Sequence, residues 1–66
     1  MSTEITSDMF TQIDAASDVL LDADTITPEE WTRIRVALLL GAYGPDDESL
    51  IRLCLESYED AHGVVS

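Results

Sequence analysis

The sequence contains no lysine, and its positive charge comes from three arginines alone. Against them stand 14 aspartates and glutamates, which give a formal net charge of −11 at pH 7 over 66 residues. A small domain normally mixes charges of both signs, which limits self-repulsion. A surface this acidic is repelled by nucleic acids and by anionic lipids, so direct binding to either is disfavoured. The excess of negative charge is therefore expected to serve a cationic partner or the solvent.

The chain is also poor in the residues that build catalytic and metal sites. It has one histidine, His62, and one cysteine, Cys54. A histidine-based metal cluster or a Ser–His–Asp triad therefore has little to build on. Residues 22–24 open like a calcium loop, but the oxygen ligand and the glycine that should follow are missing. We expect a protein that is not an enzyme and that holds no metal or cofactor.

The sequence also lacks the features of secreted and membrane proteins. A single cysteine excludes the internal disulfide that small secreted domains usually need. The first residues are acidic and lack the basic flank and apolar run of a signal peptide. The longest apolar run, residues 36–40, is too short to span a bilayer. These absences predict a cytoplasmic protein, in the cytoplasm of a host cell if it is viral, that does not contact a membrane.

What the chain does contain is a pattern of amphipathic helices. Apolar residues recur at helical spacing in three stretches, and no alternating pattern typical of a strand is present. Short connections between three such helices predict an all-α fold, a compact three-helix bundle that forms a single domain over residues 1–66. We expect flexible tails at 1–6 and 63–66. The three helices are predicted at about 7–22, 28–42 and 46–61.

The second helix has the clearest start and the least usual surface. Thr27 supplies a capping hydroxyl, Pro28 occupies the first helical position, and Glu30 follows three residues after the cap. Apolar residues then cover both sides of the helix, so it must be buried on two sides. Its second apolar side is predicted to lie in the bundle centre or at a seam with another subunit. The candidate interface residues are Val36, Leu39, Leu40 and, in the following loop, Tyr43.

Four further side chains are expected to be structural. Cys54 falls on the apolar arc of the third helix and is expected to be a small buried side chain. His62 lies near the end of that helix, where it would interact with the helix dipole. Arg33 and Arg35 are expected to pair with acidic neighbours, and surface pairs of this kind contribute ~0–1 kcal/mol each.

The acidic residues form a regular series on the first helix, where Asp14, Asp18 and Asp22 are spaced i, i+4, i+8, opposite the apolar stripe. Like charges at this spacing cost roughly 0.2–0.5 kcal/mol per pair. A solvated face is the simplest interpretation of such a run. A sharper interpretation is that the series imitates a polyanion, with one carboxylate per ~6 Å of helix against one phosphate per ~3.4 Å of a DNA strand. The residues predicted to bind the partner are Asp14, Asp18, Asp22, Asp24, Glu56, Glu59 and Asp60.

The leading functional hypothesis is an inhibitor that binds the basic site of a nucleic-acid-handling protein by DNA or RNA mimicry. In size, charge and predicted helicity alone, the chain resembles the small acidic inhibitors that viruses make against host nucleases. The alternative is a helical adaptor or homodimer with an apolar interface on the second helix, its acidity serving solubility. Salt adaptation, as in the proteins of halophiles, explains the same charge without any partner.

Overall fold

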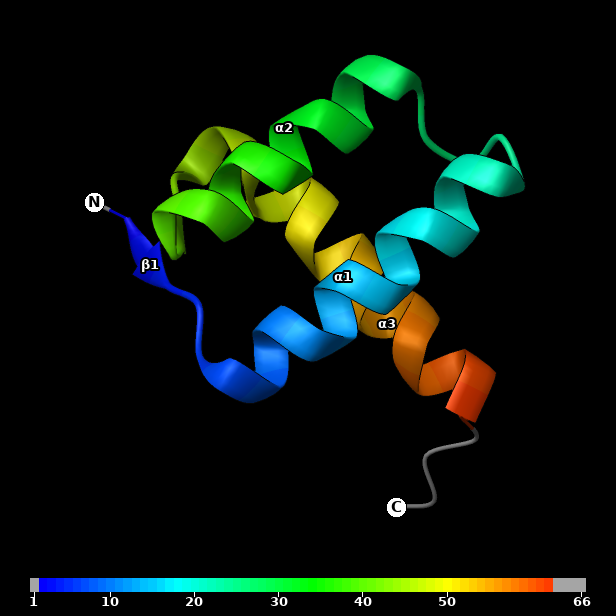
Figure 1. Cartoon of the computed structure of the whole chain (residues 1–66), viewed down its shortest axis with the longest axis horizontal. Helices are drawn as coiled ribbons and strands as arrows, with labels where there is room; N and C mark the ends of the chain where they lie inside the picture. The colour runs from blue at the N-terminus through cyan, green and yellow to red at the C-terminus, as the bar shows by residue number, and fades with distance from the viewer. Residues whose placement is uncertain (1, 63–66) are drawn as a thin grey trace.

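The computed structural model describes residues 2–62 of the 66-residue chain, with the backbone alone at residue 62. Within this range the protein is an all-α bundle of three helices, as the sequence predicted (Figure 1). None of these helices has the length and hydropathy of a membrane span. The predicted tail at 63–66 lies outside the described residues. The elements in chain order are β1 (Thr3–Glu4), α1 (Ser7–Asp22), α2 (Pro28–Leu40), β2 (Ala42–Tyr43), the short 3-10 helix η1 (Pro45–Asp47) and α3 (Glu48–His62).

Helix α1 is the central element, because it packs against both α2 and α3, whereas α2 and α3 touch each other far less. In Figure 1, α1 crosses in front of α3, and α2 lies above them. The core forms where the three helices meet. Ile13, Ile34 and Ile51, one from each helix, are fully buried there.

Local capping fixes the starts of α1 and α2. The Thr6 hydroxyl accepts a hydrogen bond from the backbone N–H of Met9 at 3.2 Å. At α2, Thr27 and Glu30 form a reciprocal capping box, with bonds of 3.2 Å to the Glu30 N–H and 2.9 Å to the Thr27 N–H. Each bond satisfies a backbone donor that the helix itself leaves without a partner. The predicted capping box of α2 is therefore confirmed.

The N-terminal segment differs from the flexible tail predicted at 1–6. Strand β1 pairs antiparallel with β2, with Thr3 opposite Tyr43 and Glu4 opposite Ala42. The next residue, Ile5, is buried, and its N–H donates to a backbone carbonyl just after α2 at 2.8 Å. Two-residue strands are too short to give an alternating hydrophobic pattern, so the sequence carries no periodic signal for this pairing.

The same pairing shortens α2 relative to the predicted span of 28–42. The helix ends at Leu40, and Gly41 follows in the left-handed conformation with φ 75°. Glycine adopts this conformation without steric cost, and it turns the chain into β2. Beyond β2, the predicted start of the third helix at 46 falls within η1, and the α-helix itself begins at Glu48.

Candidate functional site

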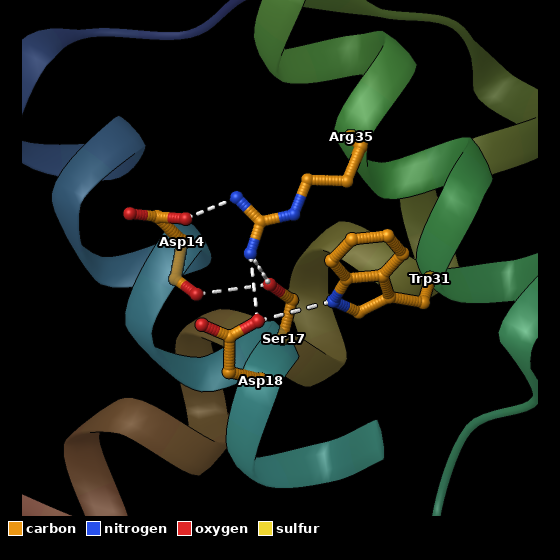
Figure 2. Close-up of polar contacts among 5 residues, drawn as sticks. All are labelled: Asp14, Ser17, Asp18, Trp31 and Arg35. Atoms are coloured by element: carbon orange, nitrogen blue, oxygen red, sulfur yellow. Dashed lines mark hydrogen bonds and ion pairs between the residues drawn. The ribbon is translucent and has the colours of Figure 1, made fainter. Parts of the chain in front are cut away.

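Two of the aspartates that were predicted to face a partner instead bind Arg35 of α2 (Figure 2). The guanidinium donates through Nη1 to Asp14 Oδ1 and through Nη2 to Asp18 Oδ1, the latter at 2.8 Å. Its central carbon lies 4.6 Å from the centroid of the Trp31 ring. The indole N–H of Trp31 in turn donates to Asp18 Oδ1 at 3.2 Å. The guanidinium is thus held between two carboxylates of α1 and an aromatic face of its own helix.

A buried hydroxyl completes this arrangement. Ser17 is fully buried, and its Oγ donates to the backbone carbonyl of Asp14 at 2.9 Å. The same oxygen accepts a hydrogen bond from Arg35 Nη2 at 3.3 Å. A buried hydroxyl without hydrogen-bond partners would destabilise the fold. Here the Ser17 hydroxyl both donates and accepts a hydrogen bond. We call Asp14, Ser17, Asp18, Trp31 and Arg35 the Arg35 cluster; it ties α1 to α2.

The Arg35 cluster corrects the expectation of one outward ridge formed by Asp14, Asp18 and Asp22. Four residues advance a helix by about 40° beyond a full turn, so such a series drifts around the helix. The drift brings Asp14 and Asp18 within reach of Arg35, although their side chains remain 45% and 65% exposed, while Asp22, near the end of the helix, is exposed and takes part in no arginine pair. A wheel drawn for one helix contains no neighbouring helix and therefore shows the whole series as solvated.

The other two arginines are also paired with acidic residues. Arg33 Nη2 lies 2.8 Å from Asp47 Oδ1, which confirms the expected pairing, and Arg52 Nη2 lies 3.2 Å from Glu48 Oε1 on the same helix. Every arginine of the chain is therefore engaged by a carboxylate. None of these arginine pairs includes the remaining predicted partner-binding residues, all of which are exposed: Asp22, Asp24, Glu56, Glu59 and Asp60.

These five exposed acids, which we call the acidic end, lie in the C-terminal part of α1, the turn after it and the C-terminal half of α3. Both helices run towards the right of the molecule in Figure 1, but they cross, so that α1 ends at the upper right and α3 at the lower right. The C-terminus of a helix carries a partial negative charge from its aligned peptide dipoles. The acids therefore add to a potential that is already negative. The five acids form two exposed groups, one at the end of α1 and one on α3, so the structure does not join all seven predicted residues into one ridge.

Asp24 occupies a backbone position that favours glycine. Its φ is 59°, in the left-handed region. Its N–H donates to the Leu21 carbonyl at 3.1 Å, and the N–H of Thr25 donates to the Leu20 carbonyl at 2.9 Å. This pair of bonds is the Schellman motif, in which the residue at the Asp24 position is usually glycine. Asp22 and Asp24 thus both lie where a negative charge opposes the helix dipole.

Asp24→Gly is therefore expected to raise the free energy of unfolding by about 1 kcal/mol, measured by urea denaturation. Asp24→Asn serves as the control, because asparagine also tolerates the left-handed region but carries no charge. Equal gains from both variants would assign the effect to charge, and a larger gain from glycine would assign it to the backbone. A loss of stability with glycine would contradict our account of this turn.

Three of the four apolar residues predicted as an interface are exposed. Leu39 is 87% exposed, Leu40 76% and Val36 47%. The prediction that they fill the bundle centre is therefore wrong, because the opposite side of α2 supplies the core. Tyr43 is half-buried and packs against the core from β2. Phe10, which was not among the predicted interface residues, is 44% exposed. Its position off the apolar stripe of α1 is the signal in the sequence for this exposure.

Cys54 is fully buried, as predicted. Burial raises the pKa of its thiol to about 11, although the nearby Arg35 cation lowers it in part. The thiol is therefore protonated at neutral pH, where only the thiolate is a strong nucleophile. The expected contact between His62 and the helix dipole involves a side chain outside the described part of the structure. Among the described residues, no group of three or more His, Cys, Asp or Glu is placed to hold a metal ion.

Comparison with known proteins adds no relative. A scan against protein-family models and searches of curated proteins and of solved structures found no match to this chain. What its described surface offers to a partner is negative charge at the acidic end and apolar contact around Leu39.

Proposed function

We propose that this protein is a non-enzymatic interaction protein that occupies the basic site of a nucleic-acid-handling protein by charge mimicry, in the cytoplasm. The observation that carries the proposal is that the positive charges are paired within the chain, whereas many of the negative charges are not. All three arginines are engaged by carboxylates of the chain, whereas the acidic end is exposed and takes part in none of these pairs. Such a surface attracts a cationic groove and repels the nucleic acid that the groove would otherwise bind.

The binding surface is the acidic end and not the ridge that begins at Asp14. Asp14 and Asp18 already bind Arg35, so part of their charge is neutralised within the chain, although their side chains are 45% and 65% exposed. The acids at the end of α1 take part in no arginine pair, so their full charge faces the solvent. Asp22 and Asp24 lie where they cost the fold stability, and natural proteins retain such local conflicts mainly at functional positions.

Electrostatic steering gives this proposal a kinetic signature. A partner groove lined by basic residues would meet the acidic end at a rate that falls as salt rises, because screening shortens the range of the attraction. Once the complex has formed, the acids replace phosphates in the groove. Free duplex DNA should therefore compete with this protein for the same groove.

The test compares two triple variants that remove the same charge from opposite parts of the molecule. Asp22→Asn, Asp24→Asn and Glu59→Gln alter the acidic end, and the control carries Glu4→Gln, Asp8→Asn and Asp46→Asn. A partner captured on the immobilised wild-type chain and released by duplex DNA is then titrated against each protein at several salt concentrations.

We expect the acidic-end variant to bind at least about tenfold more weakly and to lose part of its salt dependence, while the control stays within about threefold of wild type. Equal weakening by the two variants would mean that net charge alone governs binding, and the proposed surface would be rejected. A captured partner that duplex DNA does not release would reject the mimicry itself.

A further inference from the structure

A second surface lies beside the Arg35 cluster. Phe10 of α1 and Leu39 of α2 line an open hollow of about 270 Å³ together with Leu38 and Arg35. Val36 adjoins Leu39 by i, i+3 spacing and Leu40 by i, i+4 spacing, so it links the two leucines on the exposed side of α2. We call Phe10, Val36, Leu39 and Leu40 the apolar patch. Single exposed leucines are ordinary, but a contiguous patch with a hollow is typical of an interaction site.

A second copy of the chain fits this patch poorly. Each copy carries a net charge of −11, so association of two copies brings like charges together. A stable interface buries about 800 Å² on each partner. Four partly exposed side chains supply at most a few hundred Å², which is the size of the largest patch on an ordinary monomer. A cationic partner, in contrast, gains from the charge as well as from the apolar contact.

Acidic residues border the patch on both helices. On α1, Asp14 and Asp18 outweigh the single Arg35 cation that they bind, which leaves a net negative charge one helical turn beyond Phe10. On α2, Glu29 lies two turns before Val36 on the exposed side of the helix. The wall formed by Arg35 adds little positive charge of its own, because two carboxylates bind that guanidinium. The patch is thus an apolar surface within a negative border.

We propose, on the basis of the function proposed above, that the apolar patch docks a basic amphipathic helix of the partner. One large apolar side chain of that helix enters the hollow between Phe10 and Leu39. Its next apolar residues cover Val36 and Leu40, and its basic residues face the acidic border. This is the helix-in-groove mode of recognition, in which residues one turn apart supply the anchors. The acidic end provides long-range attraction, and the patch provides short-range fit.

The probes are two synthetic peptides of equal length with identical numbers of basic residues. One carries leucines along one helical face, and the other has serine at those positions. Each is titrated calorimetrically at about 0.15 M salt into wild type, into Leu39→Gln/Leu40→Gln, and into Val19→Thr. Val19 is the matched control, because it is 59% exposed but lies away from the patch on α1. The substituted positions are exposed, so circular dichroism should show an intact fold in all three proteins.

We expect wild type and Val19→Thr to bind the leucine peptide at least about tenfold more tightly than the serine peptide, and Leu39→Gln/Leu40→Gln to lose this preference. Equal binding of both peptides to wild type would overturn the docking proposal while leaving the acidic end in place. No salt-dependent binding of either peptide would overturn both proposals. A stable dimer in light scattering that Leu39→Gln dissociates would assign the patch to a second copy and likewise overturn the docking proposal.

Discussion

Replacing Arg35 with glutamine is expected to lower the free energy of unfolding by about 2 kcal/mol. The substitution removes both ion pairs to α1 and the contact with the Trp31 ring, and it leaves the buried Ser17 with one partner fewer. The carboxylates of Asp14 and Asp18 are about half exposed, so solvent screening reduces the Coulomb part. For a domain of this size, with a total stability of about 3–10 kcal/mol, the loss is large.

Arg52→Gln is the matched control for this prediction. It also removes one of the three positive charges and so raises self-repulsion by the same formal amount. Its pair with Glu48 is mostly exposed, at 68% and 55% of the two side chains, and lies within one helix. We expect a change within about 0.5 kcal/mol. Urea denaturation followed by circular dichroism measures both variants, and equal losses would show that Arg35 acts through net charge and not through its cluster.

A double-mutant cycle separates the pairs within the Arg35 cluster. Asp14→Asn should destabilise the wild-type protein, because it removes an acceptor from Arg35. In the Arg35→Gln background the same change should be neutral or stabilising, because it relieves repulsion between Asp14 and Asp18 at i, i+4. The cycle gives the interaction energy between Arg35 and Asp14, which is a part of the α1–α2 contact that apolar packing does not supply.

Local signals in the sequence predicted the architecture well. The start of α2 follows from Thr27, Pro28 and Glu30, which act within one helical turn and need no tertiary contact. The burial of Cys54 follows from its place on the apolar arc of α3. Signals of this kind depend on spacing alone, so they can be read without knowing how the helices pack.

The candidate site depended on tertiary contacts and was predicted less well. Arg35 was expected to pair with acidic neighbours, but its actual partners lie 17 and 21 residues away on another helix. Only the crossing of α1 and α2 determines which aspartates remain free. The apolar patch was also not predictable from the sequence alone. Helical periodicity placed Leu39 on a second apolar side of α2, but it could not decide whether that side faces the core or the solvent. Phe10 joins the patch through the way α1 and α2 pack, which spacing along one helix does not encode.

The placement of charge therefore links stability to the proposed function. Asp14 and Asp18 strengthen the bundle by binding Arg35, and in doing so part of their charge is neutralised within the chain. Asp22 and Asp24 do the reverse, because they are exposed at the unfavourable end of α1. The first pair should accordingly be sensitive in unfolding experiments, and the second pair should be sensitive in binding experiments.

The contrast between core and patch gives the largest expected effect on stability. Ile34→Ala removes a fully buried side chain from α2 and should cost about 3 kcal/mol, which raises the unfolded population about a hundredfold. Leu39→Ala removes the same number of carbon atoms from the same helix, but at a position that is 87% exposed. It should change stability by less than about 0.5 kcal/mol.

Cys54 provides the measurement for both alanine variants. Because its thiol is fully buried and its pKa is raised to about 11, alkylation at neutral pH should require the bundle to open. When closing is fast relative to alkylation, the labelling rate follows the unfolded population. Ile34→Ala should then be labelled about a hundredfold faster than wild type, and Leu39→Ala within about twofold of it. Fast labelling of Leu39→Ala in dilute solution would mean that Leu39 stabilises the fold of the single chain. The apolar patch would then be part of the folded core and not a surface available to a partner.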